Sequence, residues 1–277
     1  MSNTDLSVAV LGGPGTYSEA AAVEFFGESV KSLFYTDFDN IFDAVANGQV
    51  DRGILPIENS LAGSIHRNYD LLLRHNLHIV GEIQIHIANH LIALPGVTLA
   101  DIKKVYSHPQ PLAQCEQNLT RLLPQAERIP TYDTAGSVKL LKEKNITDGA
   151  ALASKRAANI YEMTILHHNM QDNTENYTRF VIVGRTPTLP KGEAKTTIVF
   201  SVDNVPGALF KSMAVFALRD IDLTKIESRP LQGKRWEYFF YLDFIGSQHE
   251  ERCKNALNHL QEITTYFKVL GSYPRGV

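Results

Sequence analysis

The sequence predicts a two-domain α/β protein, in which a two-lobed α/β domain is followed by a ferredoxin-like domain. Its 277 residues exceed the usual size of one domain. Short apolar strands alternate with helix-patterned segments up to residue 187, and a βαββαβ pattern begins near residue 195. Between them lies 186–194, which is rich in Pro, Gly and polar residues, as domain linkers are. The expected domains are therefore 1–187 and 195–277.

Strands and helices alternate through the first domain. The expected strands are Ser7–Leu11, Ser32–Tyr35, Gly53–Pro56, Val105–Ser107, Ala150–Ala153 and Tyr177–Val183. The expected helices are Tyr17–Phe26, Phe38–Ala46, one that ends at Arg74, Pro111–Leu122 and Ala135–Glu143. Such alternation favours mostly parallel sheets. We expect the β-rich stretch 77–94 to cross to a second lobe and Tyr177–Val183 to return. This arrangement resembles the periplasmic-binding-protein architecture, with a cleft between the lobes.

The C-terminal domain shows the βαββαβ order in about 80 residues. The expected elements are the strand Thr196–Val202, a helix from Pro206 to Arg219, the strands Ile221–Glu227 and Trp236–Phe244, a helix over Glu250–Tyr266 and the strand Phe267–Tyr273. A turn is expected at Gln232–Lys234. The order predicts a ferredoxin-like unit.

Composition excludes several classes of protein. A net charge of −3 and a pI near 6.4 argue against nucleic-acid binding. No apolar run approaches the roughly 20 residues that span a bilayer, so no membrane partner is expected. The polar N-terminus has no signal or transit pattern, and Cys115 and Cys253 fit no zinc spacing. We expect a cytoplasmic protein with two reduced thiols and no bound metal.

A glycine turn follows the first strand. The segment Gly13–Ser18 matches part of the dinucleotide fingerprint, and Asp37 lies about 20 residues further on. The proline between the glycines is unusual for a nicotinamide site. A tight turn whose amides face an anion at the start of a helix is the favoured interpretation, and a nicotinamide dehydrogenase is the alternative.

Three polar loops follow strands of the first domain. They contain Glu58, Asn59 and Ser60, then Ser107–Gln110, and then Thr134–Ser137. Ligands of open α/β sheets bind beyond the carboxyl ends of the strands, so these loops predict a small-molecule site. Each loop is also explained by helix capping alone. In the strand at 176–180, alternation places Thr178 and Phe180 on one face and Arg179 on the other.

The whole chain resembles prephenate dehydratases. The matching segments occur in the family's order and are Gly13–Ser18, Pro56–Ser60, Ser107–Gln110, Tyr132–Gly136 and Asn176–Phe180. The second domain resembles an ACT domain, with Gly207-Ala208-Leu209-Phe210 and Glu227-Ser228-Arg229-Pro230 as its two phenylalanine-regulation motifs. The stretch 64–82 and the Asp133–Gly136 motif are also similar to the arogenate dehydratases of plants.

The resemblance implies a carbon–oxygen lyase of phenylalanine biosynthesis. Prephenate loses carbon dioxide and water to give phenylpyruvate, and aromatisation drives the reaction without a redox cofactor or a metal. Thr178 is implied as the catalytic residue that assists the leaving hydroxyl. The implied substrate-binding residues are Glu58, Asn59, Ser60, His108, Thr134, Ala135, Gly136, Asn176, Arg179 and Phe180. Arogenate, which carries an ammonium in place of the keto group, is the alternative substrate.

Regulation is implied as well. L-Phenylalanine is the expected allosteric effector, and its expected site consists of Asn204, Gly207, Ala208, Leu209, Phe210, Glu227, Ser228 and Arg229. Because ACT domains commonly pair, we expect a homo-oligomer, namely a tetramer that is a dimer of dimers. A non-enzymatic amino-acid sensor with the same two domains is the remaining alternative.

Overall fold

The computed structural model describes residues 6–231 and 236–276. Packing divides the chain into two compact units, one of residues up to 65 together with 83–180, the other of 66–82 together with the chain from 181 onward. The turn expected at Gln232–Lys234 lies outside the described residues. The predicted domain boundary between residues 187 and 195 remains a prediction about which parts fold independently.

The first lobe is a parallel α/β unit. It contains strands β1 (Ser7–Leu11), β2 (Lys31–Tyr35) and β3 (Arg52–Asn59) and helices α1 (Tyr17–Phe26) and α2 (Phe38–Ala46). Strand β1 pairs in parallel with both β2 and β3. The sheet has the order β2-β1-β3-β11-β5, in which β11 is Tyr177–Gly184 and β5 is His78–His86, and the short strand β4 (Gly63–Ser64) pairs with β3. Parallel pairing brings the ends of β1 and β3 to one edge, where the polar loops begin.

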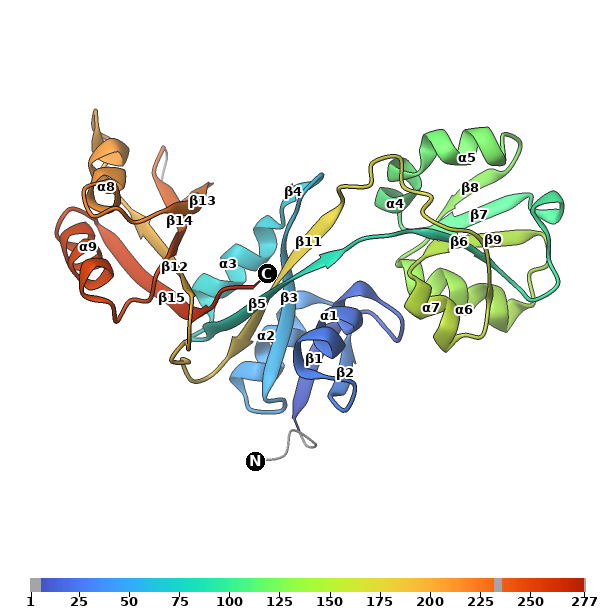
Figure 1. Ribbon diagram of the computed structural model, residues 1–277, viewed down its shortest axis with the longest axis horizontal. Helices are drawn as coiled ribbons and strands as arrows, with labels where there is room; N and C mark the ends of the chain where they lie inside the picture. The colour runs from blue at the N-terminus through green and yellow to red at the C-terminus, as the bar shows by residue number, and fades with distance from the viewer. Residues whose placement is uncertain (1–5, 232–235, 277) are drawn as a thin grey trace. The chain divides into compact units, whose positions relative to one another are not determined.

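The second lobe is a mixed sheet with the order β10-β6-β9-β7-β8. Its elements are β6 (His90–Ala93), β7 (Lys104–Ser107), α4 (Pro109–Gln114), α5 (Glu116–Leu122), β8 (Glu127–Pro130), α6 (Thr134–Lys144), β9 (Gly149–Ala153), α7 (Lys155–Ile160) and β10 (Thr164–His167). Its strands bury side chains on both faces. Leu91 and Val105 pack with α4 and α5, while Ile92 and Tyr106 pack with α6. Helices therefore cover both faces of this sheet (Figure 1).

Two segments join the lobes. Strand β5 (His78–His86) leads into the second lobe and β11 (Tyr177–Gly184) returns from it (Figure 1). The sequence predicted one continuous strand over 77–94, but the chain leaves strand geometry at residues 87–89 before β6 begins. The predicted helix Pro111–Leu122 is likewise two helices, α4 and α5, that meet at Cys115.

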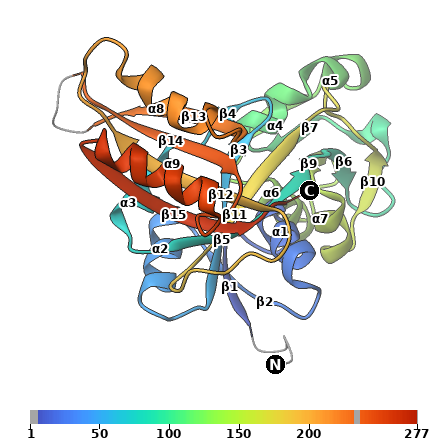
Figure 2. The ribbon, with the colours of Figure 1, turned by 60° about the vertical axis from the view of Figure 1, so that its left-hand side comes forward.

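The C-terminal part forms the predicted βαββαβ unit. Its elements are β12 (Ala194–Ser201), α8 (Ala208–Ala217), β13 (Leu223–Pro230), β14 (Tyr238–Ile245), α9 (Glu251–Glu262) and β15 (Tyr266–Pro274). The antiparallel sheet has the order β13-β14-β12-β15, so β13 is an edge strand. Helices α8 and α9 lie together on one face (Figure 2) and pack on Ile198, Phe200, Leu242 and Phe244. The ferredoxin-like prediction is confirmed.

Helix α3 (His66–Arg74) belongs to this second unit and packs on the other face of its sheet. The Tyr241 hydroxyl donates to the Tyr69 carbonyl at 2.9 Å, and the two rings lie 4.7 Å apart. A buried ion pair joins Lys195 on β12 to Glu82 on β5, with 2.6 Å between Nζ and Oε1. A segment from the first half of the sequence thus completes the packing of the C-terminal sheet.

Candidate functional site

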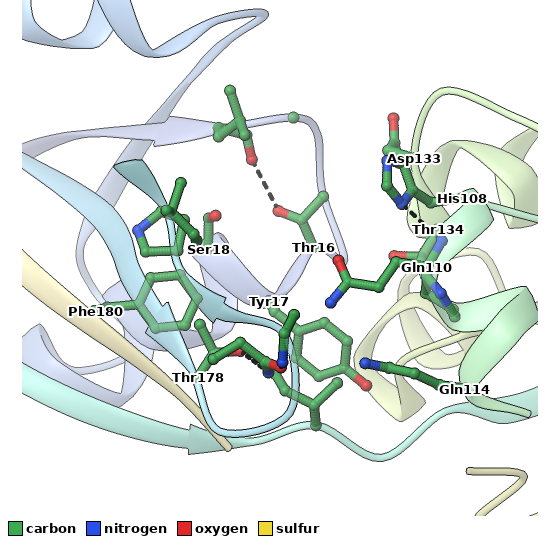
Figure 3. Close-up of a pocket in the computed structure, with 18 of the residues that line it drawn as sticks. Thr16, Tyr17, Ser18, His108, Gln110, Gln114, Asp133, Thr134, Thr178 and Phe180 are labelled. Atoms are coloured by element: carbon green, nitrogen blue, oxygen red, sulfur yellow. Dashed lines mark hydrogen bonds between the residues drawn. The ribbon is translucent and has the colours of Figure 1, made fainter. Parts of the chain in front are cut away.

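A cavity of about 460 Å³ lies in the first unit, where the loops after β1, β3, β7 and β8 meet (Figure 3). Its volume is in the range of small-molecule sites, about 300–1,000 Å³. Each of these strands ends in a turn into a helix or a hairpin, and that geometry places the polar residues at the cavity. The polar side chains that line it are Thr16, Tyr17, Ser18, Asn59, Ser64, His108, Gln110, Gln114, Tyr132, Asp133, Thr134 and Thr178.

Thr178 is held by one carboxamide. The two hydrogens of Asn59 Nδ2 are shared among three acceptors: Thr178 Oγ1 at 3.0 Å, Asn176 Oδ1 at 2.7 Å and the Tyr177 carbonyl at 3.1 Å. Asn59 Oδ1 accepts from two backbone amides, those of Leu61 and Ala62, which fixes the orientation of the carboxamide. Since Thr178 Oγ1 accepts from Asn59, its own proton must point elsewhere, and the cavity is the side it lines.

Asn176 extends this network to the second lobe. It is fully buried, and its Nδ2 donates to Gln114 Oε1 at 3.0 Å. The Gln114 side chain on α4 also lines the cavity. Both lobes therefore contribute to the position of Thr178, because a shift of α4 would disturb the chain of carboxamides that leads to it.

Two long helices begin at the cavity. Helix α1 is capped by Thr16 and helix α6 by Asp133, whose Oδ1 accepts from the Gly136 amide at 2.5 Å. The first amides of a helix have no partner within it, and its dipole favours negative charge there. Ser18 and Thr134 add hydroxyls that make no hydrogen bond elsewhere in the described ranges. The cavity is thus supplied with neutral donors suited to carboxylates.

Two further polar groups are oriented by hydrogen bonds to the backbone. His108 caps α4, and its Nδ1 accepts from the Gln110 amide at 3.3 Å, which assigns the proton of the neutral ring to Nε2. The Tyr17 hydroxyl donates to the Ala88 carbonyl at 2.7 Å, and burial raises the pKa of this phenol. Tyr17 is therefore a neutral donor at physiological pH.

Five of the predicted substrate-site residues line this cavity. They are Asn59, His108, Thr134, Thr178 and Phe180. As strand alternation predicts, Thr178 and Phe180 share the face of β11 toward the cavity and Arg179 does not line it. Arg179 as a carboxylate ligand therefore stays a prediction without support from this geometry.

The other predicted substrate residues surround the cavity without lining it. They are Glu58, Ser60, Ala135, Gly136 and Asn176. Ser60 ties the loop after β3 to β11, because its hydroxyl donates to the Glu175 carbonyl and accepts from the Tyr177 amide. At Gly136, a Cβ atom would lie 2.8 Å from the capping carboxylate of Asp133. Ser60 and Gly136 thus have structural roles in the loops, and the predicted substrate-binding role of all five residues stays a prediction.

The predicted substrate-binding residues did not include several lining residues, among them Ser18, Gln110, Gln114 and Asp133, although Gln110 belongs to one of the three loops expected at the site. A signal existed for two of them. Gln110 and Gln114 are four residues apart in one helix, so they lie on the same face and point the same way. Asp133 reads as a helix cap from sequence, and only the fold shows that a cap also lines the cavity.

The glycine turn does not form a dinucleotide site. A Cβ atom at Gly15 would lie 2.7 Å from the Cα of Ala157, and the Gly15 amide donates to the Glu19 carboxylate at 2.7 Å. A carboxylate and a packed helix thus occupy the place where a pyrophosphate would bind. Asp37 caps α2 through the Asn40 amide at 2.8 Å.

A second cavity, of about 370 Å³, lies in the C-terminal unit beside the start of α8. Five predicted effector residues line it, namely Asn204, Gly207, Ala208, Leu209 and Phe210, together with the aromatic Trp236, Tyr238 and Phe240. Gly207 has a φ of 80°, a left-handed conformation that glycine adopts without strain. The first regulatory motif thus forms one side of an aromatic-lined cavity.

The second regulatory motif does not line that cavity. Arg229 Nη2 donates to Asp70 Oδ2 on α3 at 2.7 Å, and Glu227 Oε1 lies 2.9 Å from His66 Nε2 on the same helix. Ser228 is exposed on β13. The structure therefore places Glu227 and Arg229 against α3, and their role as direct ligands of an effector stays a prediction.

The fold and the first cavity define a class of protein: a two-lobed α/β enzyme with a separate ferredoxin-like unit. A family model for prephenate dehydratase matches residues 8–188. Arogenate dehydratase/prephenate dehydratase 2 of Arabidopsis thaliana, a chloroplast protein by its name, is 49% identical over 278 residues, which cover 96% of this chain and 72% of that one. The chain therefore belongs to the prephenate dehydratase family and is a dehydratase.

Solved structures share this fold. Prephenate dehydratase of Arthrobacter aurescens in complex with L-Phe superposes with a TM-score of 0.90 at 33% identity, covering 98% of this chain and 90% of that one. A quorum-quenching acylase, GqqA, has a TM-score of 0.88 at 32% identity, covering 97% of each chain. Among the described residues, no group of three or more His, Cys, Asp or Glu is placed to hold a metal, and no helix is long and apolar enough to cross a membrane.

Proposed function

We propose that this protein catalyses the decarboxylating dehydration of prephenate to phenylpyruvate in L-phenylalanine biosynthesis, with arogenate, which gives phenylalanine directly, as the alternative substrate. The observation that carries the proposal is the orientation of the Thr178 hydroxyl. Asn59 donates to Thr178 Oγ1, so the Thr178 proton is available to a substrate in the cavity.

The proposed reaction has two bond cleavages. The bond between the ring and its carboxylate breaks, carbon dioxide leaves, and the electron pair enters the ring. The carbon–oxygen bond at the opposite ring carbon breaks, and the hydroxyl takes up a proton and leaves as water. A hydroxyl held by a fixed carboxamide stabilises the departing oxygen through a preorganised hydrogen bond. Solvent then restores the proton of Thr178.

The neutral donors of the cavity suit the two carboxylates of the substrate. Among the described lining residues there is no Lys or Arg, so amides at the starts of α1 and α6 and the hydroxyls of Ser18 and Thr134 are the donors. The ring carboxylate loses its charge during the reaction. Strong ion pairing would stabilise the ground state more than the transition state, so weaker donors favour turnover.

Turnover of purified protein on prephenate and on arogenate, without added cofactor, tests this function. We expect phenylpyruvate from prephenate or phenylalanine from arogenate. If neither product forms while L-phenylalanine still binds, the non-enzymatic sensor is the better description.

We also propose that L-phenylalanine binds the second cavity and inhibits turnover. The Arthrobacter aurescens structure is a complex with L-Phe. In this chain the second cavity offers aromatic side chains and the exposed backbone at Gly207, where the amino acid's ring and carboxylate can be accommodated. Trp236 is the single tryptophan of the chain and lines this cavity, so its fluorescence reports binding directly.

Location and assembly remain predictions. Cytoplasmic location was expected from the sequence, but the Arabidopsis thaliana relative is named as a chloroplast protein, and fractionation of the source cells decides between these compartments. The expected homotetramer is supported by apolar side chains exposed on α8, of which Phe210 is 76% and Leu209 39% accessible.

A further inference from the structure

The charge of the first cavity is unusual for a site that binds dianions. Asp133 is the charged side chain among its described lining residues, and no Lys or Arg accompanies it. Asp133 forms no ion pair within the described ranges. A carboxylate without a cation repels a further carboxylate and attracts an ammonium.

Asp133 lies across the cavity from Thr178 (Figure 3). The substrate likewise carries different groups at its two ends. Its leaving hydroxyl is on one end of the ring, and its three-carbon side chain is on the other. With the hydroxyl at Thr178, the side chain extends toward the start of α6. That side chain carries a keto group in prephenate and an ammonium in arogenate.

We infer that Asp133 is a specificity-determining residue, which receives the α-ammonium of arogenate and gives this protein a preference for arogenate over prephenate. The inference rests on the proposed function and names the substrate within it. The adjacent carboxylate of the side chain meets the Thr134 hydroxyl and the amides of Thr134 and Ala135, the first two of α6, for which the described structure shows no hydrogen-bond partner. An amino acid therefore finds an acceptor and donors side by side, whereas a keto acid finds a repelling carboxylate.

The capping function of Asp133 does not require its charge. One oxygen, Oδ1, accepts from the Gly136 amide, and asparagine caps helices as well as aspartate does. Asp133→Asn therefore removes the charge while it retains the shape and the cap. Asp37→Asn is a matched control, because Asp37 caps α2 in the same way and does not line the cavity.

The experiment compares kcat/KM for both substrates in the wild type and the two variants. We expect the wild type to prefer arogenate, and Asp133→Asn to lower kcat/KM for arogenate about 10- to 100-fold, the usual range for one charged hydrogen bond. Turnover of prephenate should stay within about threefold or increase, as repulsion is removed. Asp37→Asn should leave both values within about twofold, since a cap exchange costs little.

Other outcomes overturn the inference. An equal loss on both substrates would show that Asp133 positions the loop and does not distinguish the side chains. Unchanged turnover of arogenate would show that the ammonium binds elsewhere. If the wild type consumes neither substrate, the proposed function itself fails, and this result is separate from any effect of Asp133→Asn.

Discussion

A hydrogen bond from Asn59 orients the side chain of Thr178. The Asn59 carboxamide is fixed by two backbone donors and presents its Nδ2 to Thr178 Oγ1. The family resemblance assigned both residues to one site. It did not show the hydrogen bond between them, since Asn59 and Thr178 are 119 positions apart and their approach depends on the pairing of β3 with β11.

Removal of this hydroxyl tests its role. Thr178→Ala should lower kcat by about 10²–10⁴, the scale of a lost positioned proton donor. KM should change by less, because the hydroxyl acts mainly on the departing oxygen. Thr164→Ala, at an exposed strand position of β10, serves as the control and should retain wild-type kinetics. A kcat for Thr178→Ala within a few-fold of wild type would remove Thr178 from the mechanism.

Secondary-structure elements show which sequence signals were sufficient. Helical apolar spacing between turn residues predicted α1 and α2 at their observed bounds, and the structure adds the caps Thr16 and Asp37. Stretch 77–94 was predicted as one strand because its β-rich composition continues, yet the chain breaks where Asn89 turns into the second lobe. The β-propensity of these residues predicts strand throughout the stretch. The break arises because β5 and β6 pair in different sheets, which propensity does not show.

The start of β6 carries a pH-sensitive residue. Burial, together with His168 and Lys155, lowers the pKa of His90 to about 4, and its Nδ1 accepts from the Asn169 amide at 3.2 Å. In the unfolded chain histidine takes up a proton near pH 6.5. Between pH 6.5 and 4 the unfolded state therefore binds more protons, so stability falls as the pH falls.

Replacement of His90 should flatten this dependence. His90→Asn retains an acceptor for the Asn169 amide and has no titrating group. We expect the wild type to lose about 2 kcal/mol more than the variant between pH 7 and pH 4.5, allowing for solvent screening. Urea unfolding at both pH values measures the difference. His259→Asn, at an exposed position of α9, is the control, and identical slopes for wild type and His90→Asn would contradict the assignment.

The contact between α3 and β13 suggests a test of whether Arg229, in the second regulatory motif, binds the effector directly or acts through α3. Arg229 is bound to Asp70, and α3 follows directly on Ile65, a residue that lines the first cavity. If Arg229 acts through α3, Arg229→Ala should leave phenylalanine affinity, read from Trp236 fluorescence, within about threefold. Inhibition of turnover at saturating phenylalanine should weaken, because the coupling between the two sites is reduced.

Either alternative result is informative about this motif. Loss of phenylalanine binding in Arg229→Ala would make Arg229 a direct ligand, as the sequence resemblance implied. Unchanged binding and unchanged inhibition would assign Arg229 to structure alone. Arg252→Ala removes an arginine from the exposed end of the same unit and should behave as the wild type.

On the scale of the whole molecule, an edge strand and its apolar side chains predict assembly. Strand β13 is at the edge of the C-terminal sheet, and Ile226 on it is 47% exposed. Unpaired strand edges readily pair with another chain, and charged side chains oppose this; on β13, Glu227 and Arg229 contact α3, whereas Ile226 is on the exposed face. If the wild type forms the expected oligomer, Ile226→Lys should therefore shift it toward smaller species in sedimentation velocity. Ile160→Lys, on α7 and 39% exposed, should leave the mass unchanged.

The packing of α3 limits how the regulatory part of this chain can be exchanged. In this chain Tyr69, Asp70 and Glu82 contact Tyr241, Arg229 and Lys195. In a chimera joined at the linker near residue 190, a foreign C-terminal unit would lack these three partners. The orphaned charge of Glu82 alone would cost several kcal/mol. The proposed sensitivity to an effector therefore depends on two stretches of the sequence, and a chimera must exchange residues 66–82 together with the chain from 181 onward.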